Sequence, residues 1–431
     1  MKKNLSLICL ISFLNVTGSS QTDVFLKIQS DETRKINVAI AEFGTNQNPE
    51  LAINLRQIII DDLNYSGFLN VVDPLISPAG DLIFDNSEVI ITGDVTHKSN
   101  YFNFVFGLTE SVTGRKLMTK SLRSYPFALR VLAHTVSDEI VYQLCGEYGN
   151  ACTKIAYVTE QKGGKELALM DWDGHRATLL TRNRSINLLP CWSNDGESLI
   201  FTTYAFGGGP ILARYIFKDQ QIERFIARAG TFTSPEYSPN GKKVAFVLTY
   251  EGNADIYTAD RNGQNLQRLT SNPAIDTAPS WSPNSREIVF TSDRSGSPQI
   301  YIMDAEGGNV RRLTYENNYN SSPKWSPKGD QIVFVSNQSR GFQIYLIDVT
   351  GENLICLTDN TGSYENPTWS PNGSHLVCAS NRSGRWEIYS MLRDGSLLRQ
   401  LTFTGGNTGP AWSPRLKPDR KSTRLNSSHR M

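Results

Sequence analysis

Four residues that could bind a metal ion recur at matching places in a repeated motif. Asp276, Asn320 and Asn407 lie five residues before an aromatic anchor of the repeat, and Glu365 lies four residues before one. Carboxylate and amide oxygens are ligands that hard divalent cations prefer. If the repeats form a ring, these oxygens converge on its channel. Two interpretations follow: a metal-dependent hydrolase such as a lactonase, and a cation bound in the channel without turnover.

Motifs of other enzyme classes are missing from the sequence. It contains no G-x-S-x-G nucleophile elbow, no H-E-x-x-H zinc motif, no P-loop and no G-x-G-x-x-G dinucleotide motif. The histidines are spread over three regions of the chain, at His97, His134, His175, His375 and His429. We therefore expect a protein without enzymatic activity, without a metal site of its own and without a cofactor.

One pair of cysteines has a chemical interpretation. Cys145 and Cys152 flank the short Gly-containing turn 146–151. In an oxidising compartment a disulfide between them would close this turn. The alternative is that both thiols remain free. No C-x-x-C spacing occurs in the chain, so the other cysteines are not predicted to bind metal.

Six aromatic anchors divide the carboxyl-terminal two-thirds of the chain into repeats of 43 to 45 residues. Five are followed by Ser-Pro and one by Ser-Asn, and they are Trp192, Tyr237, Trp281, Trp325, Trp369 and Trp412. Between them, short runs of β-branched and aromatic residues alternate with turns rich in Gly, Asn and Asp. A fixed period in this range predicts an array of four-stranded blades, as in a β-propeller.

The strand that follows each anchor indicates how the ring closes. Its first copy, Ile155–Val158, has no anchor before it, and the last anchor, Trp412, has no such strand after it. We therefore expect residues 151–414 to form a six-bladed β-propeller, closed by pairing of its first and last segments. Gly207–Pro210 replaces the usual turn in the second repeat, so blade two is expected to be distorted.

A small α/β domain is predicted over residues 35–150. Asn48 and Pro49 are typical of a helix start, and apolar residues from Leu51 to Leu63 then fall on one helical face. The other predicted elements are a helix over Leu129–Leu144 and strands over Ile36–Phe43, Val89–Val95, Tyr101–Leu108 and Lys116–Ser121.

Both ends of the chain differ from its folded middle. Residues 1–20 have the layout of a secretory signal, and their apolar run is too short to span a bilayer. Residues 21–34 are predicted to be an extended arm with an apolar centre, either an edge strand of the α/β domain or a detachable recognition segment. Residues 415–431 are basic and short of apolar side chains, which predicts a disordered tail foreign to the repeat.

The charge balance excludes one class of partner. Without residues 1–20 and 415–431 the chain holds 35 basic and 41 acidic residues. A mildly acidic body without a basic stripe argues against nucleic acid. After the signal, no segment is long and apolar enough to cross a membrane, so we expect no transmembrane segment once the signal is cleaved.

A proline two residues before every anchor fixes the start of each innermost strand. The residues just ahead of it are expected in loops around one mouth of the channel. They vary between copies while their frame does not, which suits a binding surface, and ordinary solvated turns are the alternative. They are Asn187, Leu188, Phe232, Thr233, Asp276, Thr277, Asn320, Ser321, Tyr364, Glu365, Asn407 and Thr408.

The order of signal, arm, α/β domain and six Trp-Ser-Pro blades resembles the TolB family, the periplasmic component of the Tol-Pal system of Gram-negative bacteria. The resemblance covers residues 1 to about 414, and the tail departs from it. It implies a non-enzymatic protein of the periplasm that binds the lipoprotein Pal and the protein TolA. It also implies a role in envelope integrity and in outer-membrane constriction at cell division, with colicins and outer-membrane proteins as further partners.

The resemblance also implies which residues meet these partners. The Pal surface at the channel mouth would comprise Thr231, Phe232, Thr233, Asp276, Thr277, Asn320, Ser321, Tyr364, Glu365, Asn407 and Thr408. The TolA segment would be the arm residues Thr22, Asp23, Val24, Phe25, Leu26, Lys27 and Ile28.

Overall fold

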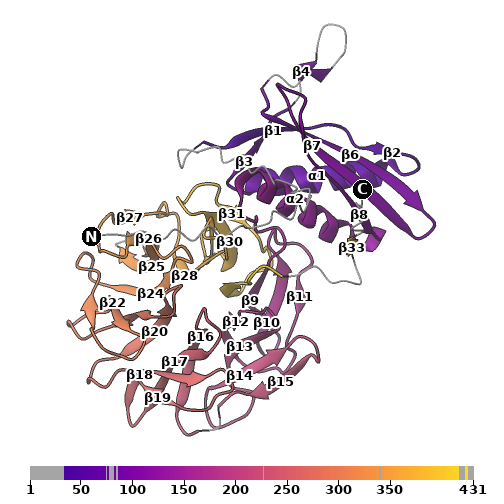
Figure 1. The fold of residues 1–431 in the computed structure, drawn as a ribbon. Coiled ribbons are helices and arrows are strands. Elements are labelled where there is room, and N and C mark those ends of the chain that lie inside the picture. Colours follow the sequence, from indigo (N-terminus) through magenta and orange to yellow (C-terminus); the bar gives the residue numbers. More distant parts are fainter. Residues whose placement is uncertain are drawn as a thin grey trace, which may run out of the picture.

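The computed structural model describes residues 34–416, apart from residues 74, 77–81, 84–85, 227 and 339–340, and also residues 423–425. The chain forms a small α/β domain followed by a six-bladed β-propeller (Figure 1), which confirms the predicted fold class. Within this described part of the chain, no helix has the length and hydropathy that a membrane crossing needs. The signal and the arm lie outside the described residues.

The α/β domain is a seven-stranded mixed sheet packed against two helices, α1 and α2 (Figure 1). The order along the sheet is β3-β1-β6-β7-β8-β33, with β2 paired to β6. Its elements are β1 (Ile36–Ile40), β2 (Gly44–Thr45), α1 (Pro49–Tyr65), β3 (Leu69–Val71), β6 (Val89–Lys98), β7 (Tyr101–Glu110), β8 (Lys116–Ser124), η1 (Pro126–Ala128), α2 (Leu129–Cys145) and β33 (Thr423–Leu425), beside a separate pair, β4 (Leu75–Ile76) and β5 (Leu82–Ile83).

Local signals in the sequence explain both helices. The Asn48 side chain accepts a hydrogen bond from the Leu51 amide at 3.1 Å, and Pro49 occupies the first position of α1. This is the expected helix start. Helix α2 ends at Cys145 and is capped by Gly146, whose φ of 77° is a left-handed conformation that glycine adopts without strain. The two helices bury their apolar faces against β1, β6 and β7 in one core.

The propeller consists of six four-stranded sheets with the repeat in the predicted register. Blade one holds β9 (Lys154–Gln161), β10 (Gly164–Asp171), β11 (Thr178–Leu179) and β32 (Asn407–Trp412). Blades two to four hold β12 (Asn187–Trp192), β13 (Ser198–Thr203), β14 (Ile211–Ile216) and β15 (Gln221–Arg224); β16 (Thr231–Tyr237), β17 (Lys243–Tyr250), β18 (Asn253–Asp260) and β19 (Gln267–Arg268); and β20 (Asp276–Trp281), β21 (Glu287–Ser292), β22 (Gln299–Asp304) and β23 (Arg311–Arg312). Blades five and six hold β24 (Asn320–Trp325), β25 (Gln331–Gln338), β26 (Gly341–Asp348) and β27 (Ile355–Cys356); and β28 (Tyr364–Trp369), β29 (His375–Ser380), β30 (Glu387–Leu392) and β31 (Arg399–Gln400).

The ring closes as predicted, by pairing of its first and last segments. Strand β32 lies antiparallel to β9, with Trp412 opposite Ile155. The Trp412 indole also donates a hydrogen bond to the Thr153 hydroxyl at 2.7 Å. Other anchors link neighbouring blades, since the Trp192 indole donates to the Ala411 carbonyl at 3.1 Å. The anchors are therefore buried packing residues, and the five tryptophan indoles among them each donate a hydrogen bond.

Blade two is less distorted than the sequence predicts. It keeps four strands in the order β12-β13-β14-β15. The irregularities are the turn Gly207–Gly209, in which all three glycines have positive φ, and the outermost strand β15, which has four residues where the other blades have two. Phe225 and Ile226 replace the Leu-Thr sequence of other repeats. They pack in the apolar core between blades two and three.

The prediction of disorder from residue 415 onward is wrong for the first residues of the tail. Arg415 donates to the Asp138 carboxylate at 3.2 Å, and the Leu416 amide donates to the Cys152 carbonyl at 3.1 Å. Residues Thr423–Leu425 pair antiparallel with β8 as β33. The composition of the tail gave no sign of these contacts because they are made through the backbone and through one guanidinium.

Candidate functional site

The six innermost strands share a backbone irregularity at the channel. In each strand the pairing register shifts after the second residue of the common six-residue motif, which is the mark of a β-bulge. The third residue has a φ between 49° and 53° in all six strands, at Leu189, Ser234, Ala278, Ser322, Asn366 and Gly409. Five of the six are not glycine, so the ring holds a conformation that costs about 1 kcal/mol or more at each of them.

The bulge changes which side chains are accessible. The typical burial along the motif is buried, half-buried, half-buried, buried, half-buried, buried, as in β24 and β28. The first residue of the motif therefore points into the interior between blades. Six predicted mouth residues are at most 1% exposed: Asn187, Phe232, Asp276, Asn320, Tyr364 and Asn407. A partner docked at the mouth cannot reach them, so this part of the predicted binding surface is corrected.

These buried polar groups have partners inside the blades instead. Arg294 donates to both carboxylate oxygens of Asp276 at 3.0 Å. The Asn320 amide donates to Gln299 at 2.8 Å, and the Asn407 amide donates to Glu387 at 2.7 Å. The predicted channel ligands are therefore dispersed between blades, and only Glu365 of the four is half-exposed.

The accessible rim carries hydroxyls, one carboxylate and one leucine. The half-buried members of the predicted surface are Leu188, Thr231, Thr233, Thr277, Ser321, Glu365 and Thr408. The third-position residues of the bulges, except for the buried Gly409, accompany them and were missed by the sequence analysis, although their position just before each proline is constant. Burial raises the pKa of the Glu365 carboxyl, so this group favours a hydrogen-bonding partner or a positive charge.

An ion pair lies deeper in the channel. The Lys324 ammonium of blade five contacts the Glu236 carboxylate of blade three, and the Ser280 hydroxyl of blade four donates to Glu236 at 2.7 Å. Burial of Lys324 disfavours its charged form. The attraction of the Glu236 carboxylate outweighs this effect and raises the pKa of the ammonium. This carboxylate is thus neutralised within the chain and is not free to hold a cation.

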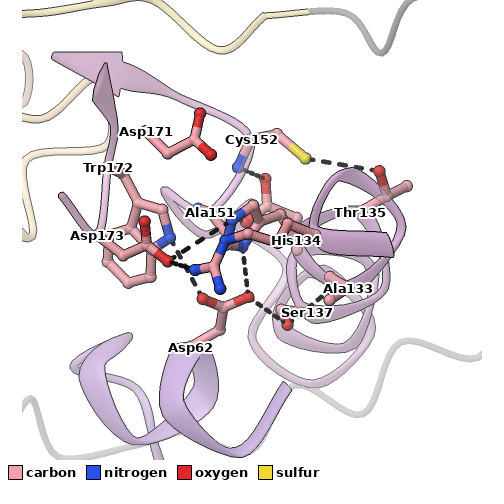
Figure 2. A network of polar contacts seen from close by, with 12 residues as sticks. Asp62, Ala133, His134, Thr135, Ser137, Ala151, Cys152, Asp171, Trp172 and Asp173 are labelled. Carbon is pink, nitrogen blue, oxygen red and sulfur yellow. Dashed lines mark hydrogen bonds and ion pairs between the residues drawn. The ribbon is translucent and has the colours of Figure 1, made fainter. Parts of the chain in front are cut away.

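A second cluster of functional side chains lies where the propeller meets the α/β domain (Figure 2). The turn after β10 projects Trp172 and Asp173 toward α1 and α2. The Trp172 indole donates to Asp62 at 3.3 Å, and His134 Nδ1 and the Ser137 hydroxyl lie 2.8 Å and 2.9 Å from the other oxygen of Asp62. The other repeats place Phe217, Arg261, Ala305, Val349 and Arg393 where this turn has Trp172.

Further contacts make this junction extensive. The Tyr65 hydroxyl lies 2.8 Å from the Ser390 hydroxyl, and His375 Nε2 lies 2.7 Å from the Tyr65 carbonyl oxygen. Burial lowers the pKa of His375 to about 4, so this ring is neutral near pH 7 and its Nε2 donates to Tyr65. Tyr65 also packs with Trp172 in an apolar cluster that continues into blade six. The two domains are therefore joined by a buried interface.

The junction includes a trio with the composition of a metal site. Ligand atoms of Asp62, His134 and Asp173 lie within 4.8 Å of one another. However, Asp62 already accepts three hydrogen bonds, and the Arg130 guanidinium contacts Asp173. A divalent cation placed here would be repelled by Arg130, so we assign no metal to these residues.

The family model of the TolB β-propeller domain matches residues 141–416, which span all six blades. The chain belongs to the TolB β-propeller family. It is 30% identical over 281 residues to the Tol-Pal system protein TolB of Desulfosudis oleivorans, covering 61% of this chain and 64% of that protein. It is 34% identical over 251 residues to the protein of the same name from Anaeromyxobacter dehalogenans strain 2CP-C, covering 55% and 57%. The chain thus matches less than two-thirds of the length of these relatives.

Solved structures of the TolB family support the arrangement of both domains. The crystal structure of TolB from Acinetobacter baumannii superposes with a TM-score of 0.77 at 26% identity, covering 88% of this chain and 97% of that one. The structure of putative TolB from Agrobacterium tumefaciens has a TM-score of 0.51 at 23% identity and shows the fold alone. The α/β domain and the propeller of this chain are therefore arranged as in TolB from Acinetobacter baumannii.

Two other predicted sites have different outcomes. Cys145 and Cys152 are free thiols, which corrects the disulfide interpretation. Cys152 Sγ lies 3.9 Å from the Thr135 hydroxyl, inside the contact between α2 and the propeller. The TolA segment, residues 22–28, lies outside the described residues, so its role remains a prediction.

Proposed function

We propose that this chain is the TolB component of a Tol-Pal system, a periplasmic protein without enzymatic activity that binds other proteins. In this proposal the channel rim binds the lipoprotein Pal and the arm, residues 21–34, binds TolA. The system would maintain envelope integrity and assist outer-membrane constriction at division, with colicins and outer-membrane proteins as further partners. The observation that carries the proposal is the match of residues 141–416 to the TolB propeller, whose six inner strands each carry a bulge at one channel.

The burial of the predicted metal ligands weighs against the metal-dependent hydrolase. Asp276, Asn320 and Asn407 each bond to a neighbour inside the propeller, so they do not converge on the channel. A cation at the rim would be held by Glu365 and by neighbouring hydroxyls alone. This donor set is sparse for catalysis, because metal-dependent hydrolysis needs several fixed ligands and an open position.

Substitutions at two adjacent residues separate binding from stability. Thr277→Arg places a long charged side chain on the rim and should weaken Pal binding at least tenfold while the free energy of unfolding stays near the unmodified value. Asp276→Ala removes the buried partner of Arg294 and should cost about 1–3 kcal/mol of unfolding free energy with little change in Pal affinity. Calorimetric titration with Pal and denaturant unfolding measure both. Equal loss of affinity in the two variants would contradict the corrected surface.

Removal of the arm tests whether the arm and the channel rim bind different partners. A mature protein lacking residues 21–33 should lose TolA binding entirely and keep its affinity for Pal, because the rim belongs to the propeller. Pull-down with each partner reads out both interactions. Loss of both, or of neither, would show that the arm is not the TolA segment.

An affinity pull-down from an envelope extract tests the whole assignment. The mature protein should recover an outer-membrane lipoprotein. Turnover of lactone or ester substrates, with no lipoprotein recovered, would favour the hydrolase instead.

A further inference from the structure

We propose that a proton on His134 holds the α/β domain onto the propeller, so that the docking of the two domains weakens as the pH rises. His134 lies on α2 between Asp62, which belongs to its own domain, and Asp173, which belongs to blade one (Figure 2). An imidazolium at this place binds a carboxylate with each ring nitrogen and so connects the domains. This switch does not depend on which proteins bind the rim or the arm.

The contacts of Asp62 fix the role of one ring nitrogen. The carboxylate of Asp62 accepts from the Trp172 indole on one oxygen and from the Ser137 hydroxyl on the other. An ionised carboxylate has no proton to give. His134 Nδ1, at 2.8 Å from Asp62, therefore carries a hydrogen and donates it.

The other ring nitrogen decides between the neutral and the charged ring. His134 Nε2 is buried, has no hydrogen-bond partner among the described residues, and lies 3.7 Å from Asp173 Oδ2. In a neutral ring with the proton on Nδ1, Nε2 would present a lone pair to this carboxylate. In an imidazolium, Nε2 presents an N–H group instead, and the contact becomes attractive. The geometry therefore favours the charged ring.

The charges around His134 also favour the charged ring, because the other nearby carboxylates already have positively charged partners. Asp171 is paired with Lys154 and Arg176, and Asp138, further along α2, is paired with Arg415. Arg130, in the first turn of α2, contacts Asp173.

This pairing leaves Asp62 with His134 as its ion-pair partner among the described residues. The Asp62 side chain is only 3% exposed, and the His134 side chain 4%. A buried carboxylate without a positive partner is costly. Loss of the proton from His134 would leave Asp62 in this state.

The pH range follows from the direction of the shift. Burial opposes the charge on His134, but Asp62, with help from Asp173 and Asp171, outweighs burial and raises the pKa of the ring above its usual value of 6.5. The stabilisation is therefore complete below the pKa of the undocked ring and is lost as the pH rises through the higher pKa of the docked ring. The junction is tightest under acidic conditions and loosens toward alkaline pH.

The second histidine of the junction provides a matched control. His375 lies between the same two domains, with Nε2 2.7 Å from the Tyr65 carbonyl, but its pKa is lowered to about 4 by burial. It is therefore neutral throughout the range in which His134 loses its proton. On unfolding, His375 regains its usual pKa of 6.5 and takes up a proton only below about pH 7.5. Above that pH, substitution of His375 removes a buried contact without changing the number of protons released.

Denaturant unfolding of the mature protein between pH 6 and pH 9 tests the switch. The unfolding equilibrium constant should rise with pH by up to tenfold per unit, the limit for one proton. In His134→Gln this rise should be reduced, with the largest difference from the unmodified protein at acid pH and convergence at alkaline pH. His375→Gln should keep the full dependence above about pH 7.5, where His375 is neutral in both the folded and the unfolded state. An unchanged slope in His134→Gln would overturn the proposal.

A measurement on the unmodified protein is independent of how the variants fold. The ¹⁵N chemical shifts of the His134 ring should report an imidazolium that titrates above its usual pKa of 6.5. A ring that titrates at or below 6.5 would overturn the proposal. Stabilisation of the unmodified protein by Zn²⁺, lost in His134→Gln, would also overturn it, because a metal requires the deprotonated ring.

Discussion

A Trp172→Ala variant should lose about 3–5 kcal/mol of unfolding free energy, as expected when a buried aromatic side chain is truncated. The indole is 1% exposed, and its ring centroid lies 5.4 Å from that of Tyr65 and 5.9 Å from that of His375. The truncation also removes the indole donor to Asp62. Because these contacts join the two domains, unfolding should separate into two transitions, which denaturant titrations followed by circular dichroism and by amide exchange can resolve.

A more conservative change at the same residue separates packing from hydrogen bonding. Trp172→Phe keeps an aromatic ring against Tyr65 but removes the donor to Asp62, so it should cost less than the alanine variant and keep a single transition. A Trp172→Ala protein that unfolds in one transition with an unchanged midpoint would mean that the junction does not couple the domains.

The repeat made the propeller predictable from the sequence. A period of 43 to 45 residues gives six independent copies of the same strand signals, and the unmatched first and last copies indicate closure. Asn48, Pro49 and the apolar spacing likewise predict α1. Strands β2 and β3, with two and three residues, carry too little periodicity to be recognised, and their pairing depends on β6 and β1.

The binding surface was only partly predictable, because strict alternation fails at the bulges. An extra residue between the second and fourth positions of the motif keeps the first position buried with the proline and the anchor. Variation at the first position, such as Phe232 and Asp276, therefore reflects packing between blades. The left-handed third residue that causes this has no signature of its own, since Leu189 and Ala278 are not residue types that favour positive φ.

The junction was hidden from sequence analysis for a different reason. Asp173 has the composition of an ordinary Asp-Gly turn, and nothing local indicates that the turn docks on another domain. The signal is comparative: this turn carries Trp172, and no other repeat has a tryptophan at the equivalent place. Long-range pairs such as Asp62 with His134 and Trp172 become visible only when the fold brings α1, α2 and blade one together.

Truncation of the chain after Gly406 should abolish cooperative folding of the propeller. It removes β32, so β9 loses the pairing of Thr159 with Asn407 and becomes an exposed edge. It also removes the Ala411 carbonyl that accepts from the Trp192 indole. Blade one would keep three strands, and the ring would open between blades one and two and between blades one and six. A loss of this size approaches the 5–15 kcal/mol that a whole domain has available, and free strand edges favour aggregation.

A truncation only ten residues later is the matched control. A chain ending at Leu416 keeps β32 and the contacts of Arg415 and Leu416 with Asp138 and Cys152, and it lacks only the segment that contains β33. It should unfold at nearly the temperature of the full chain and remain monomeric. Thermal unfolding with light scattering compares the two proteins. A chain ending at Gly406 that stays monomeric and unfolds at the same temperature would contradict closure by β32, because the ring would then hold without its last strand.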